Sequence, residues 1–188
     1  MVSSLLTHLE CSQCSRHHDA GRPQRLCEQC GRPLLARYDL ARARRVLTLA
    51  EARRRAPGFG AYAEVMPFGA PHIDLGEGRT PLVRCPGLDA LAGGAEVSVK
   101  DESLNPTGSF KARGLAAAVS RAREFGLRGV ALPTAGNAGL ALAAYAAAGG
   151  LRALVVCPAD TPRPFVEGAR LLGAEVVLHE GLIDVCAR

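Results

Sequence analysis

The sequence predicts an α/β fold built on a parallel sheet and preceded by a small metal-binding ribbon. Short apolar segments alternate with helix-length segments along the second half of the chain, which is typical of strand–helix units wound into a parallel sheet. Four cysteines near the N-terminus form a C-x2-C-x12-C-x2-C pattern, which is typical of a zinc ribbon. Apolar residues make up 48% of the 188 residues and charged residues 22%, so the composition indicates a globular chain.

The ribbon is expected within residues 1–36. Its four cysteines are Cys11, Cys14, Cys27 and Cys30. Each C-x2-C step lets two thiolates reach one ion from a tight turn, and two such steps close a four-coordinate site that has no open position for water. The pattern therefore favours structural zinc over disulfides in a chain expected in the cytoplasm. Gly31 suits the turn after the second pair, whereas Ser15 stands where glycine is usual. His17 and His18 are rival ligands, and a ribbon that has lost its metal is the alternative.

The net charge of +5 comes from the N-terminal part of the chain. Residues 1–60 contain eleven arginines and five acidic residues, whereas residues 61–188 contain twelve basic and thirteen acidic residues. A basic ribbon makes a nucleic-acid-binding or protein-binding module the non-enzymatic alternative. Residues 1–36 contain no aromatic residue for base stacking, and their arginines are spread singly. Both features argue against nucleic acid as the partner.

The chain has only two lysines among its 23 basic residues, Lys100 and Lys111. Arginine keeps its proton in proteins, whereas a lysine amine can become neutral and act as a nucleophile. Each lysine is therefore a candidate for chemistry that arginine cannot perform, although an exposed lysine is more often simply solvated.

Residues 37–72 are expected to form a helix and a linker. Apolar residues recur at helical spacing over residues 39–55, and Pro57 with Gly58 ends this predicted helix. Residues 67–86 are rich in proline and glycine, which predicts a loop that contains one short strand at 82–84.

Residues 73–188 are expected to form the α/β region. The predicted strands cover residues 96–100, 130–133, 153–157 and 175–178, and the predicted helices cover residues 109–125, 137–148, 162–172 and 182–188. Thr161 is expected to cap the helix that begins at Pro162, and Gly173 ends it. The uncharged stretch 129–151 is long enough to span a bilayer, but its five glycines and its proline indicate a strand, a turn and an alanine-rich helix instead. No secretion signal is recognised, so the expected location is the cytoplasm and no membrane partner is expected.

Two strand-to-helix turns carry the candidate site, because ligands of such folds bind where strands lead into helices. The first turn runs from Lys100 to Gly114; Pro106 and Gly108 shape it, and Thr107 and Ser109 are expected to cap the helix. Lys111 lies in the first turn of this helix, where the helix dipole opposes a cation. Desolvation at this position would therefore lower the pKa of the lysine amine.

The second turn reads Thr134-Ala-Gly-Asn-Ala-Gly139. Small residues at a helix start leave backbone N–H groups free to hold an anion such as a carboxylate, and Asn137 adds a side-chain donor. The simpler interpretation of this turn is an ordinary helix start. Neither a dinucleotide-binding glycine pattern nor a P-loop is present in the sequence.

Three motifs resemble the threonine synthases, which are pyridoxal-phosphate-dependent enzymes of the tryptophan-synthase-β, or fold-type II, class. The motifs are Leu75-Gly-Glu-Gly-Arg-Thr-Pro-Leu82, the Asn-Pro-Thr-Gly-Ser-Phe-Lys segment that ends at Lys111, and Thr134-Ala-Gly-Asn137. They match in order and spacing over residues 73–188, and the cysteine ribbon resembles the N-terminal ribbon of many threonine synthases. The lysine motif is specific for the superfamily, whereas the first motif and the ribbon favour threonine synthase within it.

The resemblance implies roles for particular residues. Lys111 would carry the Schiff base to pyridoxal 5'-phosphate, and Asn137 would hydrogen-bond the phenolic oxygen of the cofactor. The substrate carboxylate would lie on Thr134, Ala135 and Gly136. The implied reaction converts O-phospho-L-homoserine and water to L-threonine and phosphate. Lys100, beside Asp101 and Glu102, is expected in an ion pair instead.

Alternatives to this reaction remain, because Pro133 and Ala135 differ from the Ser-Thr-Gly-Asn form of many members. Another fold-type II lyase, such as a threonine or serine dehydratase or a cysteine-synthase-like enzyme, is the first alternative, and a non-enzymatic ribbon protein is the remote one. The glycine-rich phosphate cup and the partner of the pyridine nitrogen lie further downstream in the superfamily. We therefore expect the 188 residues to be an N-terminal portion, inactive alone, of an enzyme that assembles as a homodimer.

Overall fold

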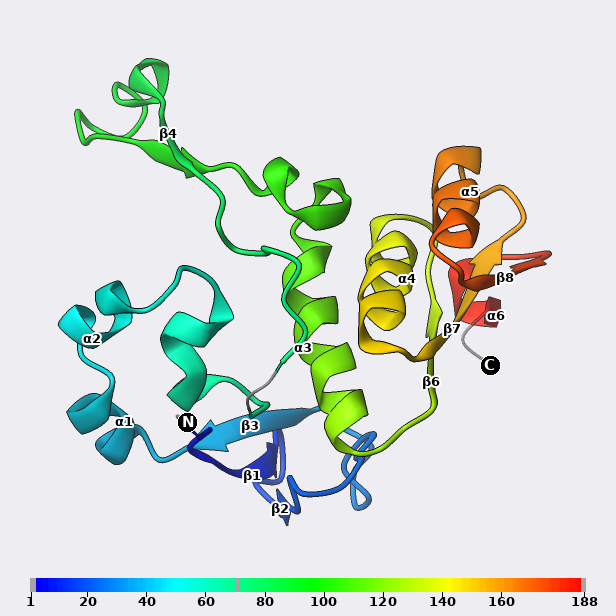
Figure 1. Ribbon diagram of the computed structural model, residues 1–188, viewed down its shortest axis with the longest axis horizontal. Helices are drawn as coiled ribbons and strands as arrows, with labels where there is room; N and C mark the ends of the chain where they lie inside the picture. Colours follow the sequence, from blue (N-terminus) through cyan, green and yellow to red (C-terminus); the bar gives the residue numbers. More distant parts are fainter. Residues whose placement is uncertain (1–2, 70–71, 187–188) are drawn as a thin grey trace.

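The structure, a computed structural model, describes residues 3–69 and 72–186, so residues 70–71 of the predicted loop and 187–188 of the last predicted helix lie outside it. The chain begins with a three-stranded antiparallel ribbon in the order β2-β1-β3 (Figure 1). Its strands are β1 (Leu6–Cys11), β2 (His17–His18) and β3 (Leu34–Tyr38). The ribbon predicted near the N-terminus is therefore a small sheet with the two cysteine pairs at its turns.

The single helix predicted over residues 39–55 is wrong, because the structure has two helices there, α1 (Leu40–Val46) and α2 (Leu49–Arg54). The break follows from a second N-cap, since the Thr48 hydroxyl accepts a hydrogen bond from the backbone N–H of Glu51 at 3.1 Å. A 3-10 segment follows at Phe59–Val65.

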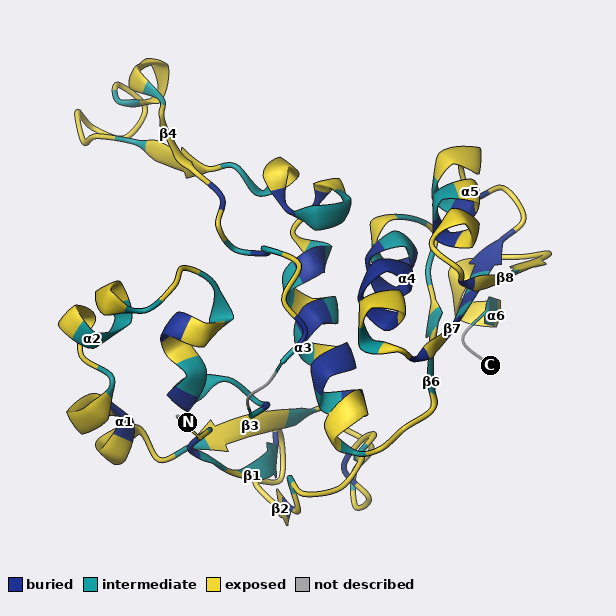
Figure 2. Cartoon of the chain, in the orientation of Figure 1, coloured by how far each residue is buried: buried dark blue, intermediate teal, exposed yellow. Residues whose placement is uncertain are grey.

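The strands predicted at 82–84 and 96–100 are present, the second in shortened form. They are β4 (Leu82–Arg84) and β5 (Ser98–Lys100), and they pair with each other as an antiparallel hairpin. Figure 1 shows this hairpin projecting away from the helices, and Figure 2 shows that its residues are mostly exposed. The hairpin is thus a two-stranded sheet separate from the parallel sheet.

The predicted parallel sheet is present in the order β6-β7-β8. The elements of this α/β unit are α3 (Lys111–Glu124), β6 (Gly129–Pro133), α4 (Asn137–Gly149), β7 (Arg152–Pro158), α5 (Arg163–Leu171), β8 (Glu175–His179) and α6 (Ile183–Cys186). The prediction of Thr161 as an N-cap is wrong: Pro162 occupies that position, with extended ψ and no side-chain cap. Its carbonyl accepts from the N–H of Phe165 at 3.0 Å.

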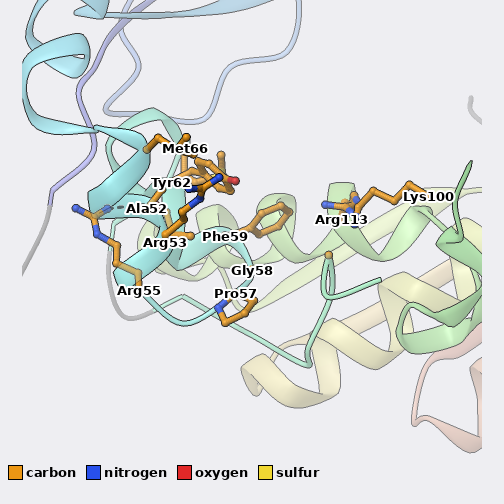
Figure 3. Close-up of a pocket in the computed structure, with 13 residues that line it drawn as sticks. Ala52, Arg53, Arg55, Pro57, Gly58, Phe59, Tyr62, Met66, Lys100 and Arg113 are labelled. Carbon is orange, nitrogen blue, oxygen red and sulfur yellow. Dashed lines mark hydrogen bonds between the residues drawn. The ribbon is translucent and has the colours of Figure 1, made fainter. Parts of the chain in front are cut away.

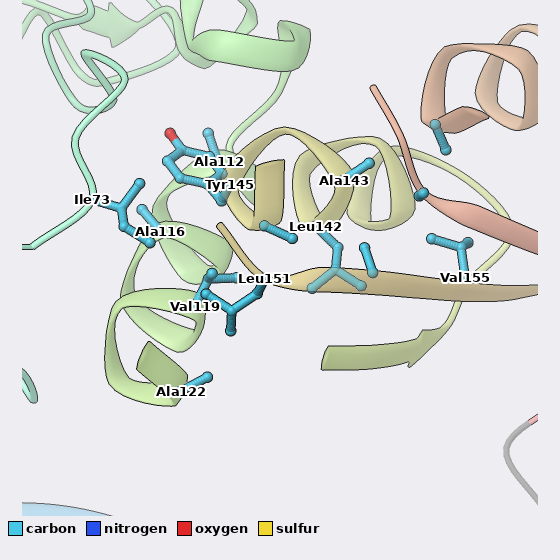
Figure 4. Close-up of a cluster of buried hydrophobic side chains, with 14 of the residues drawn as sticks. Ile73, Ala112, Ala116, Val119, Ala122, Leu142, Ala143, Tyr145, Leu151 and Val155 are labelled. Atoms are coloured by element: carbon cyan, nitrogen blue, oxygen red, sulfur yellow. The ribbon is translucent and has the colours of Figure 1, made fainter. Parts of the chain in front are cut away.

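The core lies between α3, α4 and the sheet (Figure 4). Ala112, Ala116 and Val119 recur at helical spacing on α3 and are fully buried. Small side chains let α3 and α4 approach closely, and Tyr145 of α4 fills the space between them. Within the described part of the chain, no helix has the length and apolar character needed to cross a membrane.

Candidate active site and metal centre

The turn that leads into α3 is tight, as predicted. The N–H of Gly108 donates to the Asn105 carbonyl at 2.8 Å, and both Thr107 and Gly108 have positive φ, at 66° and 71°. The predicted caps are wrong, because α3 begins at Lys111 with Phe110 as its N-cap residue and without a side-chain cap. In this turn the hydroxyls of Thr107 and Ser109 are buried, and neither has a hydrogen-bond partner in the described residues.

Lys111 is half-buried in the first turn of α3. Its amine lies 4.4 Å from the centroid of the Phe110 ring, a cation–π contact. Among the described residues, the Lys111 amine has no ion pair and no hydrogen-bond acceptor. The arrangement fits a residue that bonds covalently to a cofactor aldehyde through its amine, and the orphaned hydroxyls of Thr107 and Ser109 add polar groups beside it.

The ion pair predicted for Lys100 is wrong. Its amine donates to the backbone carbonyl of Thr80 at 2.7 Å. Glu102 pairs instead with Arg113, whose Nε and Nη2 lie 2.5 and 2.8 Å from the two carboxylate oxygens. This bidentate geometry satisfies Glu102 better than a single ammonium would.

Sequence reasoning missed a network that connects the Gly-Glu-Gly-Arg-Thr motif to the lysine turn. Glu102 also accepts from the hydroxyl of Thr80 and the amide of Asn105, each at 2.8 Å, and the Asn105 oxygen accepts from the Gly78 N–H at 2.9 Å. The Arg113 guanidinium, followed by the other donors, lowers the pKa of Glu102 to about 2. The ionised Glu102 carboxylate therefore links β5, the lysine turn and the first turn of α3.

Glu77 of the same motif is fully buried, as is Tyr145. The Tyr145 hydroxyl donates to Glu77 Oε2 at 2.7 Å, and the Leu75 N–H donates to the same oxygen at 3.0 Å. Burial, and then the hydrogen bond to Glu77, raises the pKa of Tyr145. The loop that precedes the hairpin is thus anchored on α4. The Gly-Glu-Gly-Arg-Thr motif marks this segment in the sequence, but the motif alone indicates no role for Glu77.

The second predicted turn lies between β6 and α4. Thr134 Oγ1 accepts from the Gly136 N–H at 3.3 Å, and Gly136 precedes Asn137, the first residue of α4. A Cβ on Gly139 would lie 2.8 Å from Thr134 Cγ2 and 2.9 Å from Val155 Cγ1, so only glycine lets α4 approach β7 here. The first N–H groups of α4 have no intrahelical partners, as at any helix N-terminus, and suit an anion.

The structure brings the two turns to the same end of the α/β unit. The segment Pro106–Gly108 contacts α4, and α3 and α4 both begin at the upper end of the view in Figure 1. In the part of the chain that the structure describes, no hydrogen bond joins Lys111 to Asn137 or to Thr134, Ala135 and Gly136. The turns are therefore neighbours that leave their polar groups free for a ligand.

A cavity of about 500 Å³ lies elsewhere, between the linker helices and the base of the hairpin (Figure 3). Phe59, Tyr62, Lys100 and Arg113 are among its lining residues. It includes neither Lys111 nor Asn137, and its two labelled cations near the hairpin already bind Thr80 and Glu102. We therefore do not assign this cavity to the predicted site.

The four predicted cysteines gather at one point of the ribbon, with their sulfur atoms within 4.8 Å of one another. Cys11 Sγ lies 3.3 Å from Cys30 Sγ, and Cys14 Sγ lies 3.6 Å from that of Cys27. Sulfurs bound to one tetrahedral zinc lie about 3.8 Å apart, so the set fits such an ion. The Cys14 N–H donates to Cys11 Sγ at 3.4 Å and is the main reason that the pKa of this thiol falls to about 6.

The two histidines predicted as rival ligands do not join the cysteines. His17 lies instead with His8 and Glu10 in a separate group, and His18 is buried without a partner for Nε2 among the described residues. For His17 the strand register explains this, because His17 pairs with Glu10 of β1, whose neighbour Cys11 points to the opposite face.

The fold and site together define a class of α/β enzyme, in which a lysine amine without an ion-pair partner among the described residues lies near a turn suited to an anion. Residues 73–188 match the family described as pyridoxal-phosphate dependent enzyme, and the chain belongs to this family. It is 32% identical over 178 residues to a threonine synthase of Methanosarcina acetivorans and 34% identical over 177 residues to one of Methanocaldococcus jannaschii.

These alignments cover 94% and 93% of the chain but 44% of each relative, so the chain spans less than half the length of the curated relatives it matches. The fold is also similar to the crystal structure of Escherichia coli diaminopropionate ammonia lyase in its apo form. That match has a TM-score of 0.54 at 26% identity, and it covers 61% of this chain and 37% of the lyase chain. The expected resemblance to threonine synthases and to fold-type II structures is confirmed at this level.

Proposed function

We propose that the chain serves pyridoxal-phosphate-dependent lyase chemistry, and that the reaction is threonine synthesis from O-phospho-L-homoserine and water. The observation that carries the proposal is the contrast between the two lysines. Lys100 is occupied by the Thr80 carbonyl, whereas Lys111 has no acceptor in the described residues and stands where α3 begins. The similarity to archaeal threonine synthases supports the choice of reaction.

Each residue has a distinct role in this proposal. Pyridoxal phosphate, when bound, supplies the electron sink for the substrate carbanion. Lys111 would hold the cofactor covalently, and its amine would move a proton to or from the substrate carbon. Asn137 would donate to the cofactor, and Thr134, Ala135 and Gly136 would hold the substrate carboxylate at the start of α4. The Glu102–Arg113 pair keeps the lysine turn in place.

A β-eliminating lyase of the same fold is the second candidate. The similarity to diaminopropionate ammonia lyase favours it. Pro133 and Ala135 differ from the Ser-Thr-Gly-Asn form of many members, so the carboxylate turn does not by itself select threonine synthesis. Product analysis separates the two candidates, because threonine synthase releases inorganic phosphate from O-phospho-L-homoserine and a dehydratase releases ammonia from threonine or serine.

The test exploits the presence of only two lysines. The protein is incubated with pyridoxal phosphate, reduced with borohydride and digested, and the pyridoxyl group is located by mass spectrometry. We expect the label on Lys111. Lys111→Arg should remove this label, and in the full-length enzyme it should abolish turnover, because arginine forms no imine. The matched variant Lys100→Arg should keep both. An active Lys111→Arg enzyme, or a label confined to Lys100, would overturn the proposal.

For the ribbon we propose a structural zinc ion held by Cys11, Cys14, Cys27 and Cys30. The converging sulfur atoms support this assignment, and four protein ligands leave no open position at which zinc would activate water. The ribbon at 1–36 thus serves stability, the segment 37–72 connects it, and residues 73–188 carry the catalytic groups.

A further inference from the structure

Three potential ligands lie on one face of the ribbon, apart from the cysteines. His8 and Glu10 alternate on β1 and so point to the same side of the strand, and His17 stands opposite Glu10 on β2. One ligand atom from each of the three lies within 4.8 Å of the others. The rings of His8 and His17 are 3.9 Å apart between centroids, and His17 Nε2 is 3.7 Å from Glu10 Oε2.

The hydrogen bonds around His8 fix its tautomer. The Thr7 hydroxyl lies 2.9 Å from His8 Nδ1 and donates its single proton to the Arg37 carbonyl, also at 2.9 Å. The bond to His8 must therefore run from Nδ1–H to the Thr7 oxygen. In the neutral ring this leaves a bare lone pair on Nε2, and that buried atom has no partner among the described residues. In metal-bound histidines, the ring nitrogen that does not bind the metal usually donates its N–H to a protein acceptor, and His8 has this arrangement.

Glu10 is shared between two neighbours. Its Oε1 accepts from Arg37, at 3.0 Å from Nε and 2.5 Å from Nη2. Oε2 is turned toward His17 and has no closer partner in the described residues. One carboxylate oxygen is thus available to a cation, while the Arg37 guanidinium on the other opposes it.

We propose that His8, Glu10 and His17 form a second metal site, which binds a divalent transition ion such as zinc, cobalt or nickel. Two imidazole nitrogens and one carboxylate oxygen suit these ions. Ligand atoms bound at about 2.0–2.1 Å from zinc lie about 3.4 Å apart, so the side chains close inward on binding. Three protein ligands leave positions for water, in contrast to the cysteine site. Glu10 and Cys11 are adjacent on β1, so the two sites occupy opposite faces of one strand.

The test is a cobalt titration of the metal-free, untagged chain. Thiolate ligands give intense charge-transfer absorption, whereas the histidine site gives only weak ligand-field bands, so the two sites are counted separately. We expect two equivalents in the wild type. His8→Ala and Glu10→Gln should weaken the second site at least tenfold and leave the thiolate band, which also reports an intact ribbon.

Two further variants distinguish a built site from chance binding. His179→Gln removes an exposed histidine outside the ribbon and should leave both equivalents unchanged. Arg37→Gln should tighten the second site severalfold, because it frees Glu10, whereas a purely structural role for these residues predicts no gain. One equivalent in the wild type, an unaffected second equivalent in His8→Ala, or equal loss in His179→Gln would overturn the proposal.

Discussion

The two cysteine turns of the ribbon place different residues in the same backbone conformation. Ser15 and Gly31 each follow a C-x2-C pair, and each N–H donates to the carbonyl of the first cysteine, at 3.2 and 2.8 Å. Both residues are left-handed, with φ of 56° and 66°. An L side chain pays about 1–2 kcal/mol there, so the serine noted as unusual from sequence is a strained position.

This equivalence predicts opposite effects for reciprocal substitutions. Ser15→Gly should stabilise the ribbon by about 0.5–1 kcal/mol, since glycine's loss of backbone entropy offsets part of the gain. Gly31→Ser should destabilise it by about 1 kcal/mol through the backbone alone, because a Cβ at Gly31 would meet no atom within 4 Å. Hydrogen exchange of β1 amides measures the free energy of local opening. Equal signs for the two variants would contradict the argument.

The lysine assignments show where sequence reasoning ends at the scale of single residues. The scarcity of lysine singled out both Lys100 and Lys111, and the helix position distinguished the second. The partner of Lys100 followed from the strand pairing, which brings its amine to the Thr80 carbonyl rather than to the adjacent carboxylates. Proximity in sequence is a weak guide to ion pairs here, because Asp101 accepts from the Ser103 N–H and Glu102 binds Arg113.

At the scale of elements, hydrophobic periodicity predicted the strands and helices of the α/β unit, whereas the predicted helix caps were wrong. The alternation of strands and helices after residue 110 was correct because α3, α4, β7 and α5 each bury apolar residues in one shared core. The helix over residues 39–55 failed because only Ala43 is buried in it. With little burial to hold one long helix, the hydroxyl of Thr48 decides where the chain breaks.

The Glu102–Arg113 pair joins elements, and its strength should depend on pH. The folded pKa of Glu102, about 2, lies below its unfolded value of about 4.3. The pair therefore stabilises the fold fully above pH 4.3, and this contribution is lost as the pH falls toward 2. Arg113→Gln should lower the free energy of unfolding by about 1–3 kcal/mol at pH 7, and the difference from wild type should shrink between pH 4.3 and 2.

Denaturant unfolding across this pH range measures the effect. Arg163→Gln is the matched control, since Arg163 is 85% exposed in its pair with Glu167 and such pairs contribute little. It should change stability by less than about 0.5 kcal/mol at every pH. A deficit in Arg113→Gln that stayed constant down to pH 2 would contradict the assignment of Glu102 as the titrating group.

At the scale of the whole molecule, the ribbon and the α/β unit have separate interiors. The main hydrophobic cluster extends from Ile73 to Ala174 and includes no ribbon residue. Arg121 of α3 donates to the Ala20 carbonyl of the ribbon, and the Leu5 N–H donates to the Glu64 carbonyl of the linker at 2.8 Å. No pattern in the sequence indicated a contact between segments a hundred residues apart, such as that of Arg121 with Ala20.

Separate interiors predict that metal removal acts locally. Metal binding supplies much of the folding free energy of small ribbons, so chelation, or Cys27→Ser, should expose the amides of β1 and β3 to hydrogen exchange. The amides of α4 and β7 should keep their protection, because their core contains no metal ligand. Cys157→Ser is a matched control for loss of a thiol outside the ribbon: it should leave the zinc content unchanged. If chelation released α4 and β7 together with β1, the ribbon would be an integral part of a single cooperative unit, and contacts such as that of Arg121 with the Ala20 carbonyl would couple the ribbon to the α/β unit.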